Sequence, residues 1–414
     1  VVQSMPEGFY SGDQPNLNLR RFVEEHAIPY DPEHDEYKAS AFTKAITTTK
    51  ATAIYNMHTY WSKKPHDAIR QYIRHYTSQN DLVLDPFCGS GGTCLAALLD
   101  SGAAIAIDRS PAATFITKNY STPVPHSAIA DALLAIQSST QKEFDWLYGT
   151  KCDRCGKDAV VGYTVYSQVF QCNRCLAKIP LYDCTEVVEA GDDGKDKKYN
   201  ACPHCIKGGH KERIRSQGEK FGSIPVATSY ICLSGCKPKR HFRSHNDENS
   251  KAKKFFYDYD LAKISEIEKA SIPYWYPQGY SMKGLSRYQR DALFYYEVEE
   301  VADLYTKRNL WAIATVRDAL SRIQNDSVRD FLLFGLNAAL LGVSRMVRAS
   351  NTATMPGTYY MPQVSKEVHV WESFENKTEV ALKGHREIDF PTTPKILVST
   401  QSSCDLVAIP PNTI

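Results

Sequence analysis

Residues 85–93 read Asp-Pro-Phe-Cys-Gly-Ser-Gly-Gly-Thr, and this stretch decides the fold of the segment around it. The apolar run Leu82–Leu84 comes directly before it and predicts a buried parallel strand. A helix over 91–101 and a second buried strand over Ala104–Ile107 are predicted to follow. Strand, glycine-rich turn, helix and strand together predict a right-handed βαβ unit.

The glycine-rich turn predicts a binding site for a ligand that comes close to the backbone. Glycines admit such a ligand where a Cβ atom would block it, and the first N–H groups of the following helix favour a carboxylate. Asp85 at the strand tip can face an ammonium group. Asp108, at the end of the second strand, suits hydrogen bonds from ribose hydroxyls. The alternative is a glycine turn of another nucleotide-binding fold.

Two stretches resemble motifs of a known family, the DNA amino-methyltransferases that modify adenine at N6 or cytosine at N4. Residues 85–93 resemble their motif I, and His58–His66, which reads His-Thr-Tyr-Trp-Ser-Lys-Lys-Pro-His, resembles their motif X. The resemblance implies an α/β, Rossmann-like class I methyltransferase fold that binds S-adenosyl-L-methionine. The cofactor-binding residues that it implies are His58, Tyr60, Lys64, Pro65, Asp85, Pro86, Phe87, Gly89, Ser90, Gly91, Thr93 and Asp108.

The family's catalytic motif has no convincing match in the sequence. Members carry Asp/Asn/Ser-Pro-Pro-aromatic at the tip of the fourth strand, where it orients the target amine and stacks on the flipped base. The one Pro-Pro pair here, Pro410-Pro411, follows Ile409, whose side chain accepts no hydrogen bond. Residues 403–406 resemble motif III instead, which implies that Asp405 contacts the adenine amino group. An aspartate without a ligand is the alternative for Asp405, and no catalytic residue is predicted.

These matches predict an incomplete methyltransferase sheet. The family fold has a fourth strand beside the first, so an exposed edge is expected next to the cofactor strand. We expect a missing C-terminal half or a second chain to complete the sheet. We also expect residues 1–414 alone to methylate nothing.

The cysteine spacing predicts two structural zinc sites. Eight of the twelve cysteines form four close pairs in one segment, which favours metal binding in a reducing compartment over disulfides. We expect the first two pairs to share one tetrahedral Zn²⁺ and the last two to share another. The expected ligands are Cys152, Cys155, Cys172 and Cys175 at the first site, and Cys202, Cys205, Cys232 and Cys236 at the second.

Further expectations concern the surroundings of these ligands. A β-hairpin with strands at Thr164–Tyr166 and Val169–Gln171 is predicted between the first two cysteine pairs. Spare ligand candidates are Cys184, His204 and His210, whereas Cys88, Cys94 and Cys404 are expected to be structural parts of the α/β core.

Two stretches are candidates for contact with DNA. Residues 237–254 are rich in Lys, Arg and His and could lie along phosphates, although a solvated loop explains them nearly as well. Tyr274–Tyr276 could stack on bases, although a core or interface role is favoured. The formal net charge of +2 gives the whole chain no strong attraction to nucleic acid.

The expected domain plan has five parts, and we find neither a membrane-spanning apolar run nor a signal peptide. Helices are expected near Leu19–His26, from Pro65 onward, near 289–306 and near 327–348, and a strand is expected at Lys395–Val398. The parts are an N-terminal arm (1–50), an S-adenosylmethionine-binding part (51–123), a zinc-binding insertion (124–260), a mostly helical candidate target-recognition region (261–390) and a return to the methyltransferase sheet (391–414).

Taken together, the sequence predicts a DNA methyltransferase acting on an exocyclic amine of adenine or cytosine. Double-stranded DNA is the expected partner, and the bacterial cytoplasm, in restriction-modification or phage defence, is the expected setting by family association. The alternatives are an RNA guanine-N2 methyltransferase and a non-catalytic DNA-binding subunit that keeps the cofactor fold.

Overall fold

The computed structural model describes residues 16–100, 102–190, 195–215, 220–350, 354–355, 357–392, 395–404 and 406–414. The chain forms two compact units, and helices α6 (His126–Tyr148), α12 (Asp326–Leu340) and α13 (Val370–Arg386) contribute residues to both. No described helix combines the length and the apolar character needed to span a bilayer. The first unit comprises residues up to Leu133, Ile323–Ala338 and Glu375–Ile414, and the second comprises Leu134–Arg322 and Ala339–Phe374.

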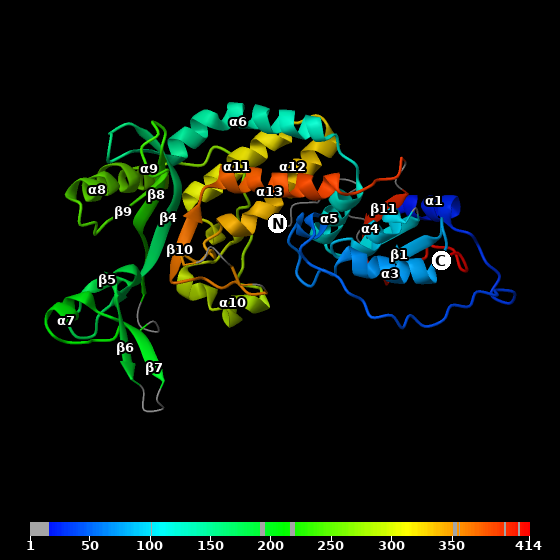
Figure 1. Ribbon diagram of the computed structural model, residues 1–414, viewed down its shortest axis with the longest axis horizontal. Coiled ribbons are helices and arrows are strands. Elements are labelled where there is room, and N and C mark those ends of the chain that lie inside the picture. Colours follow the sequence, from blue (N-terminus) through cyan, green and yellow to red (C-terminus); the bar gives the residue numbers. More distant parts are fainter. Residues whose placement is uncertain are drawn as a thin grey trace. The chain divides into compact units, whose positions relative to one another are not determined.

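A three-stranded parallel sheet forms the centre of the first unit. Its strands are β1 (Leu82–Asp85), β2 (Ala103–Asp108) and β11 (Ile396–Thr400), in the order β1-β2-β11. The blue strand β1 and the red strand β11 therefore belong to one sheet, although they come from opposite ends of the chain (Figure 1). The predicted strands and the mixed α/β character are confirmed.

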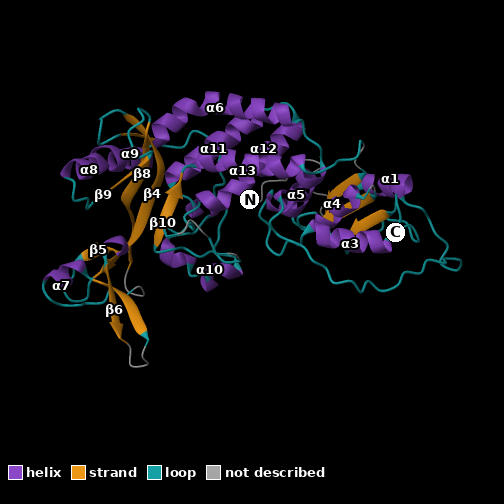
Figure 2. Cartoon of the chain, in the orientation of Figure 1, coloured by secondary structure: helices purple, strands orange, loops and turns teal. Residues whose placement is uncertain are grey.

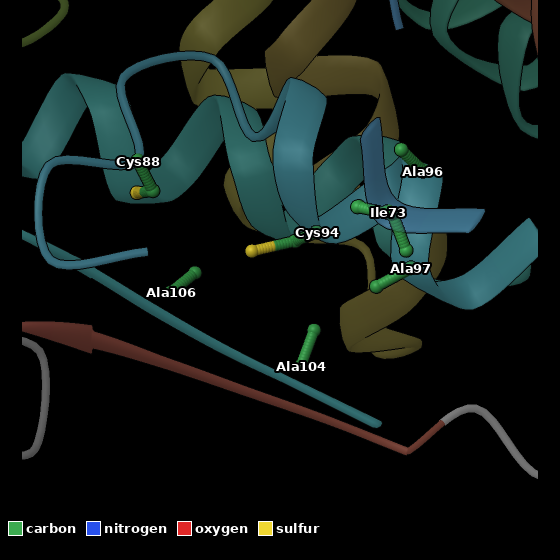
Figure 3. Packing of buried hydrophobic residues seen from close by; sticks show 7 residues of the cluster. All are labelled: Ile73, Cys88, Cys94, Ala96, Ala97, Ala104 and Ala106. Atoms are coloured by element: carbon green, nitrogen blue, oxygen red, sulfur yellow. The ribbon is translucent and has the colours of Figure 1, made fainter. Parts of the chain in front are cut away.

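The central strand β2 is buried on both of its faces, which explains its unbroken apolar sequence. Ala104 and Ala106 pack against α4 (Gly92–Leu99), where Cys94 lies between the helix and the strand (Figure 3). The alternate residues, Ile105 and Ile107, belong to a different apolar cluster. That cluster includes residues of α1 (Leu17–His26), so α1 covers the second face of the sheet.

Two further predicted helices of the first unit are present, α1 and α3. The helix expected near Leu19–His26 is present as α1, and Pro65 directly precedes α3. Helix α5 starts with Pro111 after Ser110, whose side chain accepts a hydrogen bond from the Ala113 N–H group. The helices are α1 (Leu17–His26), α2 (Ala53–Asn56), α3 (His66–Tyr76), α4 (Gly92–Leu99) and α5 (Pro111–Ser121).

Two long antiparallel strands, β4 and β8, form the centre of the second unit (Figure 2). They belong to a six-stranded sheet with the path β10-β4-β8-β9, in which β3 and β5 also pair with β4. A separate hairpin is formed by β6 and β7. The strands are β3 (Gly149–Lys151), β4 (Asp158–Gln171), β5 (Lys178–Pro180), β6 (Thr185–Ala190), β7 (Asp196–Ala201), β8 (Lys220–Cys232), β9 (Arg240–Ser244) and β10 (Val364–Val368).

The helical elements of the second unit surround this sheet and include several single turns. The α-helices are α7 (Pro203–Lys207), α8 (Ser250–Phe255), α9 (Ala262–Lys269), α10 (Ser286–Arg290) and α11 (Lys307–Ser321). The other helical segments are η1 (Leu181–Asp183), the π-helical η2 (Phe256–Leu261), η3 (Leu293–Tyr296), η4 (Val301–Leu304) and η5 (Leu341–Val343).

Two local predictions in this unit are wrong. The two segments expected to be the strands of a hairpin, at 164–166 and 169–171, are parts of the single strand β4. The helix expected near 289–306 is instead a series of short turns. Ala292 and Glu297 both have a φ of 54°, a left-handed conformation that interrupts an α-helix.

Arg243, from the basic stretch, lies in the core rather than on the surface. Its guanidinium is fully buried and forms an ion pair with Asp260 at 2.7 Å. It also donates hydrogen bonds to the Thr150 hydroxyl and to the Lys151 carbonyl oxygen. The expectation that this side chain could lie along DNA phosphates is therefore wrong.

We expect Arg243→Ala to lower the free energy of unfolding by about 3–5 kcal/mol, because it leaves the carboxylate of Asp260 buried without its partner. Thermal and urea unfolding followed by circular dichroism would measure the change. Arg240→Ala, on the same strand but exposed, is the control and should change stability by less than about 0.5 kcal/mol. Equal losses in the two variants would contradict this assignment.

Candidate functional site

The turn between β1 and α4 depends on glycine at two positions. Gly89 and Gly91 have φ values of 51° and 77°, a region that L-residues rarely adopt. A Cβ atom on Gly91 would also lie 2.6 Å from the Thr117 side chain. The Thr117 hydroxyl donates to the carbonyl oxygen of Gly89 at 3.1 Å. Through Thr117, helix α5 therefore holds the backbone of the turn in this conformation.

Both predicted acidic residues hold backbone N–H groups of this region. Asp85 Oδ1 accepts from the Phe87 N–H group at 3.1 Å. Asp108 Oδ2 accepts from Gly89 N–H at 3.0 Å, and its Oδ1 accepts from Ser110 N–H at 2.8 Å. The side chain of Asp108 thus joins the ends of the first two strands at the glycine turn.

A cavity of about 360 Å³ lies over this turn, and most of the predicted cofactor residues line it. Its volume is within the range of small-molecule sites. The predicted residues that it brings together are Tyr60, Lys64, Asp85, Phe87, Gly89, Ser90, Thr93 and Asp108.

The segment resembling motif X lies against the turn. A Cβ atom on Gly89 would lie 3.2 Å from the Tyr60 ring, and one on Gly92 would lie 3.6 Å from the Lys64 carbonyl oxygen. Burial and the nearby charge of Asp108 raise the pKa of the Tyr60 hydroxyl, so it is protonated and can donate a hydrogen bond at neutral pH.

Some predicted cofactor residues lie away from this cavity. His58 lines a different cavity, described below, while Pro65, Pro86 and Gly91 shape the backbone without lining either cavity. Asp405 lies outside the described residues.

The sequence analysis missed five residues that also line the cavity over the glycine turn: Ser62, Lys63, Ile69, Cys88 and Gly92. All five are next to predicted motif residues or in the following helix, so sequence proximity was the available signal.

The residues lining this cavity fit S-adenosylmethionine chemically. Two carboxylates can accept from an ammonium group and from hydroxyls, and each carboxylate oxygen can accept more hydrogen bonds than the one it makes with the backbone. The first N–H groups of α4 have no partner within the helix and can donate to a carboxylate. The glycines also allow the Tyr60 ring and the Thr117 side chain to pack closely against the turn, which a Cβ atom on Gly89 or Gly91 would prevent.

Eight cysteines form two tetrads in the second unit, and all eight are the predicted ligands. Within each tetrad the sulfur atoms lie within 4.8 Å of one another. Sγ–Sγ distances are 3.6 Å for Cys155–Cys232 and 3.7 Å for both Cys172–Cys205 and Cys175–Cys202. A tetrahedral zinc with bonds of about 2.3 Å places its sulfurs about 3.8 Å apart, so these tetrads could hold zinc.

The predicted sharing of the cysteine pairs between the two sites is wrong. Cys152 and Cys155 join Cys232 and Cys236, whereas Cys172 and Cys175 join Cys202 and Cys205. The cause is the length of β4, which separates the first two pairs by 14 extended residues, about 45 Å. Strand β8 returns antiparallel, so Cys232 lies opposite Ala159 at the start of β4.

The four cysteines outside the tetrads form no disulfide bonds. Cys88 and Cys94 are buried in the core cluster beneath α4, as expected, but Cys404 is exposed and not a core residue. Neither Cys184 nor His204 nor His210 belongs to a described group of metal-ligating side chains.

Only some residues of the two candidate DNA-contacting stretches are exposed to solvent. His241 is buried, and His245 pairs with Asp183 at 2.9 Å, so of the basic stretch before 246 only Lys237, Lys239 and Arg240 are exposed. In the aromatic stretch, Trp275 is 45% exposed and its ring lies 4.0 Å from the Arg317 guanidinium. Tyr276 lines a cavity of about 790 Å³ within the second unit.

Comparison with known proteins supports the assignment of the glycine turn. A family model described as DNA methylase matches residues 28–119, which contain the motif X segment, the turn and the end of β2. This segment is therefore a DNA N6/N4 amino-methyltransferase domain, and the predicted resemblance is confirmed. A methyltransferase of this family implies S-adenosylmethionine as cofactor. No curated protein and no solved structure matches the chain.

Paired cysteine substitutions distinguish the two ways of sharing the ligands. Cys152→Ser with Cys232→Ser damages one tetrad, and we expect one zinc per chain to remain. Cys152→Ser with Cys172→Ser damages both tetrads, and we expect no zinc to remain. Elemental analysis of purified protein would measure this. The reverse pattern would restore the sharing predicted from the sequence.

We expect Asp108→Ala to weaken S-adenosylmethionine binding roughly 10- to 100-fold, because it removes a charged acceptor and releases the N–H groups of the turn. Isothermal titration calorimetry would measure the affinity. The exposed Asp131→Ala in the same unit is the matched control and should bind like the wild type. An unchanged affinity for Asp108→Ala would remove this residue from the site.

Proposed function

We propose that this protein is a DNA methyltransferase that transfers a methyl group from S-adenosylmethionine to an exocyclic amine, adenine N6 or cytosine N4. The observation that carries the proposal is the cavity over the glycine turn, where Asp85, Asp108 and the start of α4 converge within the segment that matches the DNA methylase family. The family resemblance supports a role in bacterial restriction-modification or defence, in the cytoplasm.

In this proposal the chain's residues bind and orient the cofactor. S-adenosylmethionine supplies an electrophilic methyl group when bound. Asp85 accepts hydrogen bonds from its ammonium group, the N–H groups at the start of α4 hold its carboxylate, and Asp108 accepts from the ribose hydroxyls. Tyr60 closes the cavity from the motif X side.

We further propose that the sheet is a Rossmann-like methyltransferase sheet that takes an additional strand. Within the described residues β1 pairs with β2 alone, which leaves its other edge open at the cofactor site. A further strand, from a second chain or a longer polypeptide, would pair there and carry the polar-Pro-Pro-aromatic motif. The position of β1 at the end of the strand order supports the proposal.

The two cysteine tetrads support a structural role for zinc in this proposal. Four thiolates fill a tetrahedral coordination sphere and leave no position for a reacting water. One zinc would then join the start of β4 to the end of β8, and the other would join the end of β4 to the β7–α7 segment, in a part of the chain with small apolar clusters of its own. We propose the second unit, including residues 261–322 and 339–374, as the region that contacts the target sequence in DNA.

We expect purified residues 1–414 to bind S-adenosylmethionine but to transfer no methyl group to DNA, because the sequence contains no polar-Pro-Pro-aromatic stretch that would orient the target amine. Calorimetry measures the first property, and transfer of a radiolabelled methyl group to mixed-sequence DNA measures the second. Label in DNA would overturn the proposal that the motif lies elsewhere. Absence of cofactor binding would overturn the methyltransferase assignment itself.

A further inference from the structure

A second, larger cavity of about 920 Å³ lies in the first unit, next to the candidate cofactor cavity. The two cavities share Tyr60, Ser62 and Lys63 in their walls. The larger cavity is formed by residues 50–63 and by one side of α13, segments that are far apart in the sequence. Neither the proposed cofactor nor the proposed metal sites use this cavity.

The charges of the two cavities differ. The cofactor cavity is lined by two carboxylates and two lysines, which balance. The larger cavity is lined by four lysines and a single carboxylate, that of Glu387. The cationic sulfonium of S-adenosylmethionine is disfavoured in such surroundings, whereas an anionic ligand is favoured.

Three of the four lysines are free to meet an anion. Lys50 and Lys383 are exposed, Lys377 is partly exposed, and none of them pairs with a carboxylate of the described residues. The ammonium of Lys63 instead has partners within the protein, because it donates hydrogen bonds to the carbonyl oxygens of Tyr55 and His58.

His58 in the same wall adds no positive charge at neutral pH. Its Nδ1–H group donates to the Thr59 carbonyl oxygen, and its ring contacts Phe334. Burial, with the nearby charges of Lys63 and Lys377, lowers the pKa of His58 to about 4. The positive charge of the cavity therefore comes from the lysines.

The same cavity presents an aromatic surface. Trp61 lines it and is 48% exposed, so its ring is accessible to a ligand. A cationic groove combined with an exposed aromatic ring is the arrangement that binds single-stranded nucleic acid, with phosphates at the cations and a base on the ring.

We propose that this cavity binds a single-stranded segment of DNA, with its phosphates at Lys50, Lys377 and Lys383 and a base against Trp61. The inference rests on the proposed function, because an enzyme that modifies a base must take it out of the duplex. A strand held beside the cofactor cavity would stabilise that opened state.

The test measures binding of a fluorescein-labelled, mixed-sequence 12-nucleotide single strand to the full chain by fluorescence anisotropy, over a range of salt concentrations. Each phosphate contact contributes about 0.7 to the slope of log affinity against log salt. The triple variant Lys50→Gln, Lys377→Gln, Lys383→Gln should therefore lose about 2 from this slope. Trp61→Ala should weaken binding roughly tenfold and leave the slope unchanged.

The control removes three positive charges from exposed positions outside the cavity, by Lys38→Gln, Lys44→Gln and Arg386→Gln. It should bind like the wild type, and circular dichroism should show the same fold in all variants. Equal slopes for the two triple variants, or no binding of the strand by the wild type, would overturn the inference. A titration with S-adenosylmethionine tests the proposed function separately, since that ligand does not depend on these lysines.

Discussion

The parallel pairing of β11 with β2 is the constraint on which the rest of the first unit depends. The chain leaves the sheet after α5 and returns to it only at Ile396, so everything between must begin and end near the same sheet. Because β2 then has partners on both sides and helices over both faces, it is the best-protected strand of the unit. Because β2 is the buried central strand, its last residue, Asp108, has a fixed position at the edge of the glycine turn.

The second unit depends on a different constraint, the antiparallel pairing of β4 and β8. The two strands run side by side for most of their lengths, with three irregularities of register. The first two cysteine pairs flank β4 and Cys232 ends β8, so the ladder keeps the first two pairs apart and brings Cys232 to Cys155. Cys202 and Cys205 follow β7 and complete the tetrad at the other end of β4. Backbone pairing, rather than the order of the cysteines along the chain, therefore determines the composition of each tetrad.

Local sequence patterns predicted much of the first unit and less of the second. The strands around the glycine turn, helix α1 and the eight thiol ligands could be predicted because each depends on a few neighbouring residues. The sharing of the cysteines could not, because it depends on whether 158–171 is one strand or two. The burial of Arg243 could not be predicted either, because it depends on an ion pair with Asp260, a residue of a different element. The lysines of α13 beside the motif X segment were missed for the same reason.

The tetrads at the two ends of the β4–β8 ladder have a consequence for how this protein can vary. Cys155 comes shortly before β4 and Cys232 ends β8, so at this end the strands cannot slide along each other without separating these sulfurs. At the other end Cys172 follows β4, whereas Cys202 and Cys205 follow β7 and are distant from β8 in the sequence. An inserted or deleted residue in β4 must then be absorbed by a new bulge or by a matching change in β8. Among relatives, changes of length near the Cys232 end of these two strands should therefore occur together, whereas the β6–β7 hairpin is free to lengthen at its turn.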